Sequence, residues 1–152
     1  MRVAHQWVLS HIYDAVVAAG YEDLGRAHVG LFRYPTTDGL RPTELAERIH
    51  VTKQSVNDVL RDMEDFGYLV RAPDPTDGRA RVIRLTERGR QLEDVIHEGA
   101  HSAESAIARS LGPRRFYQFR ASLEEVVNRI AQGNLSTPLK GKPLPAASTK
   151  PR

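Results

Sequence analysis

The chain has 152 residues, of which 40% are hydrophobic and 27% charged, a composition typical of one globular domain with a core of ordinary size. Cys is absent, which excludes disulfides and thiol chemistry. The sequence also has no run of about 18 apolar residues, the length needed to span a membrane. The N-terminus lacks the continuous apolar stretch of a secretory signal, so we expect a cytoplasmic protein without a membrane partner.

The formal charge of +3 is unevenly distributed along the chain. Residues 134–152 contain four bases and no acid, and their Pro, Ser and Thr content predicts a disordered basic tail. The other 133 residues hold 18 bases and 19 acids, a net charge of −1. A nucleic-acid surface in this body would therefore depend on the placement of individual cations.

The first part of the chain reads as helices. Apolar residues recur at helical spacing between residues 8 and 16 and predict a helix that ends near Gly20. A weaker helical segment covers about residues 24–34, and "PTTDG" at 35–39 predicts a turn.

Two further helices follow, separated by a short break. The segment "RPTELAERI" has Pro42 at the first helical position, where no amide partner is lost. The next helix has Thr52 as its N-cap and Gly67 as its stop. Its apolar residues should face inward, namely Val56, Leu60 and Met63. The pair predicts a helix–turn–helix.

A β-hairpin is predicted next, because "YLVRAP" and "RARVIRLT" are rich in β-branched and aromatic residues and flank "DPTDG". Pro75 fixes one dihedral of the turn, and Gly78 permits a positive φ. Thr86 then caps a long helix that reaches about residue 111. After "GPRR" comes a last helix whose apolar residues are spaced 3, 4, 3, 4, a seam suited to packing against another helix.

A helix–turn–helix followed by a hairpin describes a winged helix–turn–helix, and residues 44–89 resemble the MarR family of bacterial transcription regulators. The family's D-x-R-x(5)-L-T-x-x-G pattern is matched by Asp77, Arg79, Leu85, Thr86 and Gly89. The flanking helices also agree in number, order and approximate length, so the likeness covers roughly residues 3–133.

The resemblance implies a mostly α (α+β) fold, a winged helix–turn–helix with N- and C-terminal dimerisation helices. Residues 1–133 would form one domain, with the winged part at about 28–89 and dimerisation helices at 1–22 and 90–133. It also implies an obligate homodimer that binds double-stranded DNA at a pseudo-palindromic operator, often released by a small-molecule effector.

The terminal helices, with part of the long helix, should form the dimer interface, although the same seam also fits an intramolecular core. The interface candidates are Leu9, Ile12, Tyr13, Phe116, Phe119, Leu123, Val126 and Ile130.

In the wing, Arg79 can enter the minor groove, where A·T-rich stretches concentrate negative potential. Asp77 is close enough to orient the Arg79 guanidinium, and the alternative is that the two side chains merely pair within the wing. Arg81 and Arg84 point to opposite faces of an unbulged strand, so at most one of them favours DNA.

The recognition helix, at residues 52–66, should place its first residues in the major groove, where Gln54 and Asn57 can each read an adenine edge. Thr52 either contacts a base or only caps the helix. Arg41 and Thr43 either contact phosphate or are solvated. The full set of candidate DNA-binding residues is Arg41, Thr43, Thr52, Lys53, Gln54, Ser55, Asn57, Arg61, Asp77, Arg79 and Arg81.

Three residues depart from the family pattern. Asp58 stands where many relatives carry arginine, and Gln54 where proline is frequent. Asp58 can accept a hydrogen bond from cytosine or pair with a neighbour such as Arg61. His50 occupies the turn position that usually has glycine, at a cost on the order of 1 kcal/mol if φ is positive there.

Ligand sites are less sharply indicated. An aromatic acid could lodge against Trp7, His11, Arg33 and Tyr34. Alternatively, Trp7 and Tyr34 belong to the core or the dimer interface. A spacing of four places Glu93, His97 and His101 on one helix face, which fits either a metal site or a polar stripe, and we assign no metal.

Enzymatic function finds no support, because the sequence has no phosphate-binding glycine loop, no Cys nucleophile and no G-x-S-x-G elbow, and no cofactor is expected. Two alternatives to a DNA-binding regulator remain. One is a winged-helix module that docks on a protein, which Asp58 favours. The other is a metal- or small-ligand-responsive switch.

Overall fold

The computed structural model describes residues 2–33, 37–49 and 51–133. The predictions made for Tyr34, His50 and the tail at 134–152 lie outside these residues. The chain divides into two compact units, Met1–Ala106 and Ile107–Arg152. Within the described ranges, no helix has the combination of length and apolar character that a membrane crossing requires.

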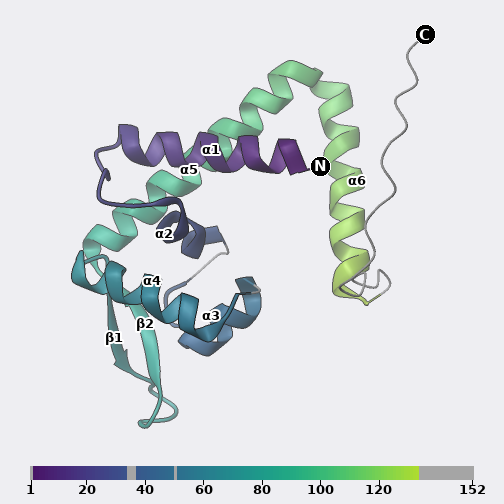
Figure 1. Ribbon diagram of the computed structural model, residues 1–152. Helices are drawn as coiled ribbons and strands as arrows, with labels where there is room; N and C mark the ends of the chain where they lie inside the picture. The colour runs from purple at the N-terminus through teal and green to yellow at the C-terminus, as the bar shows by residue number, and fades with distance from the viewer. Residues whose placement is uncertain (1, 34–36, 50, 134–152) are drawn as a thin grey trace. The chain divides into compact units, whose positions relative to one another are not determined.

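The first unit has the element order of a winged helix–turn–helix, as predicted (Figure 1). Its elements are α1 (Arg2–Ala18), α2 (Arg26–Gly30), the 3-10 helix η1 (Leu31–Arg33), α3 (Pro42–Ile49), α4 (Lys53–Asp65), β1 (Leu69–Pro73), β2 (Arg81–Leu85) and most of α5 (Glu87–Leu111). The first helix is longer than the sequence pattern indicated. The segment predicted at 24–34 is instead broken into two short elements.

One hydrophobic core joins the helices to the hairpin. Val16 of α1, Leu45 of α3, Ile83 of β2 and Leu92 of α5 are all buried in the same cluster. The three residues of α4 that were predicted to face inward, Val56, Leu60 and Met63, belong to it as well. Since the inner face of α4 is held by this core, its opposite face is left for solvent or a partner.

Local chemistry sets both ends of α4 as the sequence predicted. The Thr52 hydroxyl accepts a hydrogen bond from the Ser55 amide at 3.1 Å, which satisfies one free amide of the first turn. Gly67 ends the helix with φ +78°, in the left-handed region that favours glycine. Both helix boundaries are therefore confirmed.

The wing, defined as β1, β2 and the loop between them, is an antiparallel hairpin whose register runs from Leu69 opposite Leu85 to Pro73 opposite Arg81. It projects past α4, at the end of the unit opposite α1 (Figure 1). The positive φ that Gly78 permits is not used, since Gly78 is not among the described glycines with a positive φ. Asp side chains close the loop instead, as shown below.

The junction between the wing and α5 explains the Leu-Thr-x-x-Gly part of the motif. The Thr86 hydroxyl donates to the Gly67 carbonyl at 2.7 Å and accepts from the Gly89 amide at 3.2 Å, which caps α5 as predicted. The Thr86 amide donates to the Tyr68 carbonyl at 3.0 Å. A Cβ on Gly89 would lie 2.0 Å from that same carbonyl oxygen, so no side chain fits there.

Helix α1 crosses α5 within this unit (Figure 1). Gly99 marks the close approach, since a Cβ there would lie 3.2 Å from the Ala15 Cβ and 3.3 Å from the Ile12 Cα. Ile12 and Tyr13 pack against the core of the first unit. Among the interface candidates of α1, these two therefore already have partners within the chain.

In the second unit, α6 (Pro113–Ala131) follows Gly112, whose φ is +76°. Pro113 occupies the first helical position, as the "GPRR" break suggested. No residue of α6 is buried. Its large exposed apolar residues include Phe119, Leu123, Val126 and Ile130. Within the second unit, this seam therefore has no core of its own to bury it.

Candidate nucleic-acid interface

The first turn of α4 presents short polar side chains to solvent. Thr52, Lys53, Gln54 and Ser55 are all exposed. The Thr52 and Ser55 hydroxyls bond each other at 2.8 Å, so Thr52 is engaged in the cap. No described residue forms a hydrogen bond or ion pair with the side chain of Lys53 or Gln54. These two side chains are the most available on this helix for a partner.

Asn57, predicted to read an adenine edge, is engaged within the protein. Its Nδ2 donates to the Lys53 carbonyl at 2.9 Å, and its Oδ1 accepts from Arg71 Nη1 at 3.1 Å. Arg71, on β1, also donates to the Asn57 carbonyl at 3.3 Å and pairs with Glu64 at 3.4 Å. Arg71 therefore ties the wing to α4, a role that the sequence analysis missed because the contact joins separate elements.

An open groove runs along the outer face of α4 beside β1, lined by Gln54, Asn57, Asp58, Arg61, Glu64 and Arg71. Asp58 and Arg61 form an exposed ion pair at 3.8 Å, one turn apart, as anticipated. This pair places opposite charges side by side on the face of α4 that would meet a partner. Exposed pairs of this kind are weak, so either side chain can exchange its partner for an external one.

At the wing tip, Asp77 orients Arg79 differently from the prediction. The Asp77 carboxylate accepts from the Arg79 amide at 3.1 Å, not from its guanidinium. The Arg79 side chain is exposed and forms no hydrogen bond or ion pair with any of the described residues 2–33, 37–49 and 51–133. Pairing between the two side chains within the wing, the alternative reading, is therefore not observed.

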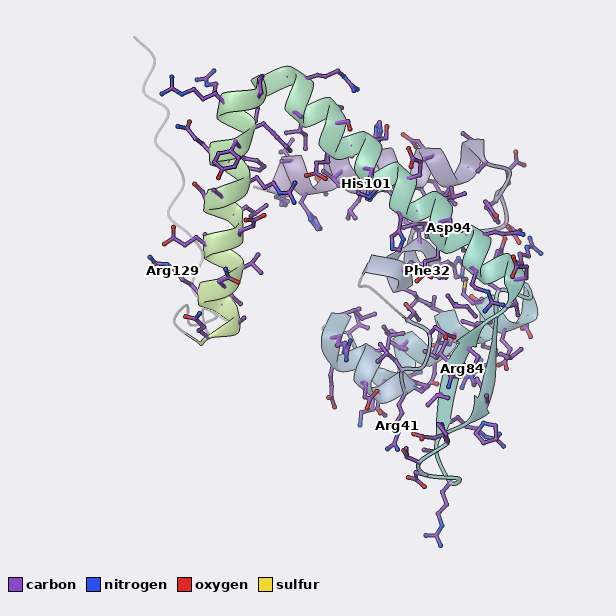
Figure 2. All side chains as sticks on the ribbon, turned by 180° about the vertical axis from the view of Figure 1, so that it is seen from behind. Phe32, Arg41, Arg84, Asp94, His101 and Arg129 are labelled. Carbon is purple, nitrogen blue, oxygen red and sulfur yellow. The ribbon has the colours of Figure 1, made fainter. Side chains whose placement is uncertain are left out.

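The two arginines of β2 differ in their surroundings. Arg84 lies 3.4 Å from Asp38, whose carboxylate also accepts from the Leu85 amide at 2.7 Å (Figure 2). Arg81 is exposed at the start of β2, opposite Pro73. Of the two, Arg81 is the one left open to a partner, in keeping with the expectation that they point to opposite faces.

Arg41 and Thr43 lie at the start of α3. Thr43 is exposed, whereas the Arg41 guanidinium contacts the wing through Asp74 at 2.7 Å (Figure 2). The Asp74 hydrogen bond and charge raise the pKa of Arg41. Hydrogen bonds from the Thr76 hydroxyl and amide, and then from Arg41, hold the pKa of Asp74 well below its usual range. Both groups are thus charged at neutral pH.

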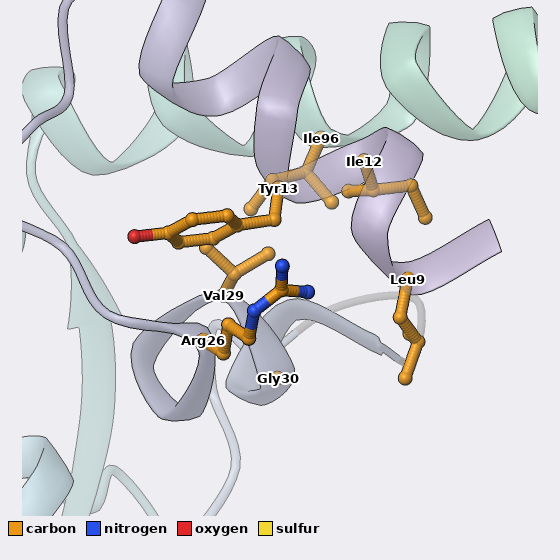
Figure 3. Close-up of a pocket in the computed structure, with 7 residues that line it drawn as sticks. All are labelled: Leu9, Ile12, Tyr13, Arg26, Val29, Gly30 and Ile96. Carbon is orange, nitrogen blue, oxygen red and sulfur yellow. The ribbon is translucent and has the colours of Figure 1, made fainter. Parts of the chain in front are cut away.

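A small cavity lies between α1, α2 and α5, lined by Leu9, Ile12, Tyr13, Arg26, Val29, Gly30 and Ile96 (Figure 3). Its wall is mostly apolar, and its volume is about 90 Å³. The Arg26 guanidinium is the one charged group in the lining, 4.7 Å from the centre of the Tyr13 ring and 3.2 Å from the Ser10 hydroxyl. An apolar wall with one cation suits a small organic anion.

The ligand residues predicted from the sequence are not those that line the cavity. Trp7 is 45% exposed and stacks on His11 at 5.2 Å, and the core alternative for Trp7 is therefore wrong. His11 bonds the Ser102 hydroxyl at 3.1 Å. The side chain of Arg33 lies outside the described residues, as does Tyr34. Arg26 was missed because its partners lie in another helix and no local spacing reveals them.

Among the described residues, no group of three or more His, Asp or Glu side chains is arranged to hold a metal ion. His97 and His101 are exposed on α5, and His101 lies 4.0 Å from Glu104. Both histidines are thus exposed polar residues of α5 in this structure.

A helix–turn–helix with an open recognition face, followed by a wing with an exposed arginine at its tip, defines the class of winged helix–turn–helix proteins. Residues 23–80 match the model of the MarR family. The chain is 36% identical to the HTH-type transcriptional regulator PetP of Rhodobacter capsulatus over 107 residues, which are 70% of this chain and 64% of PetP. Residues 23–80 therefore carry the sequence of the MarR family, as the resemblance predicted, and the longer alignment with PetP agrees with this.

Solved structures share the fold. A MarR transcriptional regulator from Methanosarcina mazei Go1 superposes with a TM-score of 0.69 at 21% identity, covering 86% of this chain and 93% of that one. The Mycobacterium tuberculosis MarR family protein Rv2887, in complex with salicylic acid, gives a TM-score of 0.62 at 26% identity, with 82% and 91% covered. In sequence, the aligned part of this chain spans less than two thirds of its curated relatives, 64% of PetP and 63% of the Rv2887 repressor.

Proposed function

We propose that the protein is a sequence-specific, double-stranded-DNA-binding regulator of transcription, which acts in the cytoplasm as a homodimer on a pseudo-palindromic operator. The observation that carries the proposal is the pairing of an open first turn of α4 with an exposed Arg79 at the tip of the wing. The names of the relatives, a transcriptional regulator and a transcriptional repressor, support it.

In this function α4 lies in the major groove, where donor and acceptor patterns distinguish base pairs. Lys53 contributes charge and Gln54 an amide that can bond a base edge. Arg79 enters the neighbouring minor groove, whose potential attracts a guanidinium. Asn57 acts through Arg71 to hold the wing against α4, and is not a base contact.

The homodimer is supported by α6. Its apolar residues Phe119, Leu123, Val126 and Ile130 recur at a 3–4 spacing and remain exposed. That spacing suits a helix from a second copy, because an apolar seam of this kind is stabilised when water is excluded from it. Two recognition helices related by a two-fold axis would read half-sites about 34 Å apart.

An effector is the further part of the proposal. The lining of the cavity beside Arg26 matches the chemistry of a small aromatic acid, with the carboxylate on the guanidinium and the ring against Val29 and Ile96. The salicylic acid complex of Rv2887 supports this ligand class. At about 90 Å³ the cavity is smaller than the roughly 150 Å³ that holds benzene in other proteins, so binding would displace a lining side chain. That displacement would couple the ligand to the fold.

The test is affinity for a duplex selected from a random pool, measured for the wild type, Arg79→Ala and Arg109→Ala. Arg109 is an exposed arginine near the end of α5, remote in sequence from the wing, and serves as the control. We expect Arg79→Ala to weaken binding by on the order of 1–2 kcal/mol, about 5- to 30-fold, and Arg109→Ala to have little effect. Equal affinities for all three proteins would remove the wing from the mechanism.

A winged-helix module that docks on a protein remains the second candidate, favoured by the exposed Asp58 on the recognition face. It predicts weak DNA binding that does not change with salt, whereas a regulator that neutralises phosphates loses affinity steeply as salt rises.

A further inference from the structure

Arg41 lies at the N-terminus of α3, but its side chain reaches the wing. Its Nε and Nη2 both lie 2.7 Å from Asp74 Oδ2, and its Nη2 lies 3.8 Å from Asp77 Oδ2. The Asp74 side chain is only 7% exposed, against 36% for Arg41. The contact joins residues 33 positions apart, so it is a tertiary link between the helix–turn–helix and the wing.

The second oxygen of Asp74 fixes the start of the wing loop. Asp74 Oδ1 accepts from both the amide and the hydroxyl of Thr76, each at 2.7 Å. The Asp74 amide donates to the Ala80 carbonyl at 3.1 Å, which closes the base of the loop. The Asp74 carboxylate therefore binds Arg41, at the start of α3, through one oxygen and the wing loop through the other.

Asp77 continues this chain of bonds to the tip. Its Oδ1 accepts from the Arg79 amide at 3.1 Å, and its carbonyl accepts from the Ala80 amide at 2.9 Å. Gly78 has no Cβ, and a Cβ added there would have no neighbour within 4 Å, so packing does not restrain this part of the loop. The hydrogen bonds of Asp77 therefore define the backbone at Arg79. The Arg79 side chain itself is free to meet a partner.

We infer that Arg41 is a positioning residue, which holds the wing loop through Asp74 and Asp77 so that Arg79 is presented at a fixed place relative to α4. The inference rests on the proposed function, and it assigns Arg41 a role other than the two that the sequence suggested, a phosphate contact or a solvated side chain. The guanidinium edge formed by Nε and Nη2 is engaged by Asp74 and also faces Asp77, so a phosphate approaching this edge would meet two carboxylates of its own sign of charge.

The backbone of α3 does not depend on this contact. The Arg41 amide donates a hydrogen bond to the Glu44 carboxylate at 3.1 Å, and this bond does not involve the Arg41 side chain. Arg41→Ala should therefore leave α3 folded while releasing the wing. Arg48, also on α3 and exposed, has no ion pair with a described residue and provides the matched control, Arg48→Ala.

The first arm of the experiment needs no DNA. Hydrogen exchange of the Thr76, Arg79 and Ala80 amides would be measured by NMR in the full chain for the wild type, Arg41→Ala, Asp74→Asn and Arg48→Ala. We expect exchange to be roughly two- to fivefold faster in Arg41→Ala and Asp74→Asn, the scale of a partly exposed ion pair, and unchanged in Arg48→Ala. Unchanged exchange in Arg41→Ala would overturn the inference.

The second arm is a double-mutant cycle of Arg41→Ala and Asp74→Asn, in which the affinity for the selected duplex is measured. If Arg41 acts by positioning, each single variant weakens binding by a similar factor, the double variant is no weaker than either, and the salt slope stays that of the wild type. If Arg41 contacts phosphate, its removal lowers the salt slope by about one, while Asp74→Asn leaves binding unchanged or tighter, and the inference fails.

The two arms separate this inference from the proposed function. A wild-type protein that binds no selected duplex refutes the DNA-binding function, and with it the role of Arg41 in DNA recognition. Exchange that accelerates in Arg41→Ala would still establish the link between α3 and the wing.

Discussion

Gly89→Ala should be strongly destabilising, although alanine is usually the better helix residue. The added Cβ would lie 2.0 Å from the Tyr68 carbonyl oxygen, 3.1 Å from its carbon and 3.4 Å from the Leu85 Cβ. The nearest atom belongs to the backbone and accepts the Thr86 amide at 3.0 Å, so it cannot turn aside as a flexible side chain could. Either α5 moves away from the wing or that hydrogen bond is lost.

The expected magnitude follows from two opposing effects. Overpacking costs about 1–3 kcal/mol, and loss of the Thr86 bond at a buried carbonyl adds about 1 kcal/mol. Against this, Ala in place of Gly in a helix contributes roughly 1 kcal/mol. We expect a net decrease in the free energy of unfolding of about 1–3 kcal/mol.

The assay is urea denaturation at one fixed protein concentration, since dimerisation would make stability concentration-dependent. Gly78→Ala is the matched control, because a Cβ at Gly78 has nothing within 4 Å and its φ is not positive. That control should change stability by less than about 1 kcal/mol. If Gly89→Ala were as stable as the wild type, the close approach of α5 to the Tyr68 backbone would be refuted.

The remaining predictions concern assembly, the tail and alkaline pH. Replacing Leu123 and Val126 by Glu should dissociate the dimer, because both lie exposed on the apolar face of α6, and a double variant that sediments as a dimer would disprove the interface. Removing residues 134–152 should lower nonspecific DNA affinity and its salt slope, because the segment carries four bases; an unchanged slope would separate the tail from binding. Burial, followed by the bond to Asp23, raises the pKa of Tyr68 to about 12. The neutral phenol is thus favoured in the folded state. Its contribution is complete below the unfolded value of about 10 and is lost as pH rises through about 12. Tyr68→Phe should remove this fall from the alkaline stability profile measured in urea, and an identical profile would contradict the assignment.

Much of the fold could be predicted because its signals are local. Thr52 caps α4 and Thr86 caps α5 through amides three residues away, and Gly67 needs only its own positive φ. The hairpin was predicted from its turn residues, but the bonds from the Asp74 and Asp77 carboxylates to loop amides, formed without a positive φ at Gly78, were not.

The site was harder to predict because its side chains are assigned by tertiary contacts. The sequence offers Arg41 as a phosphate contact and Asn57 as a base contact, but it does not reveal that Asp74 binds the Arg41 guanidinium. Nor does it reveal that Arg71 donates to both the main-chain carbonyl and the side-chain amide oxygen of Asn57. Arg26 acquires its place in a cavity from Tyr13 of a different helix. A helical or strand period shows which face a residue occupies, but not which distant side chain already occupies its polar atoms.

The most direct test of the account is selection of bound duplexes from a randomised pool, followed by affinity at two salt concentrations. The account predicts an enriched palindromic motif with half-sites about one helical turn apart, bound far more tightly than the pool and with an affinity that falls steeply with salt. No enriched motif, with and without small aromatic acids present, together with weak binding that salt does not change, would contradict a DNA-binding regulator and favour the protein-docking module.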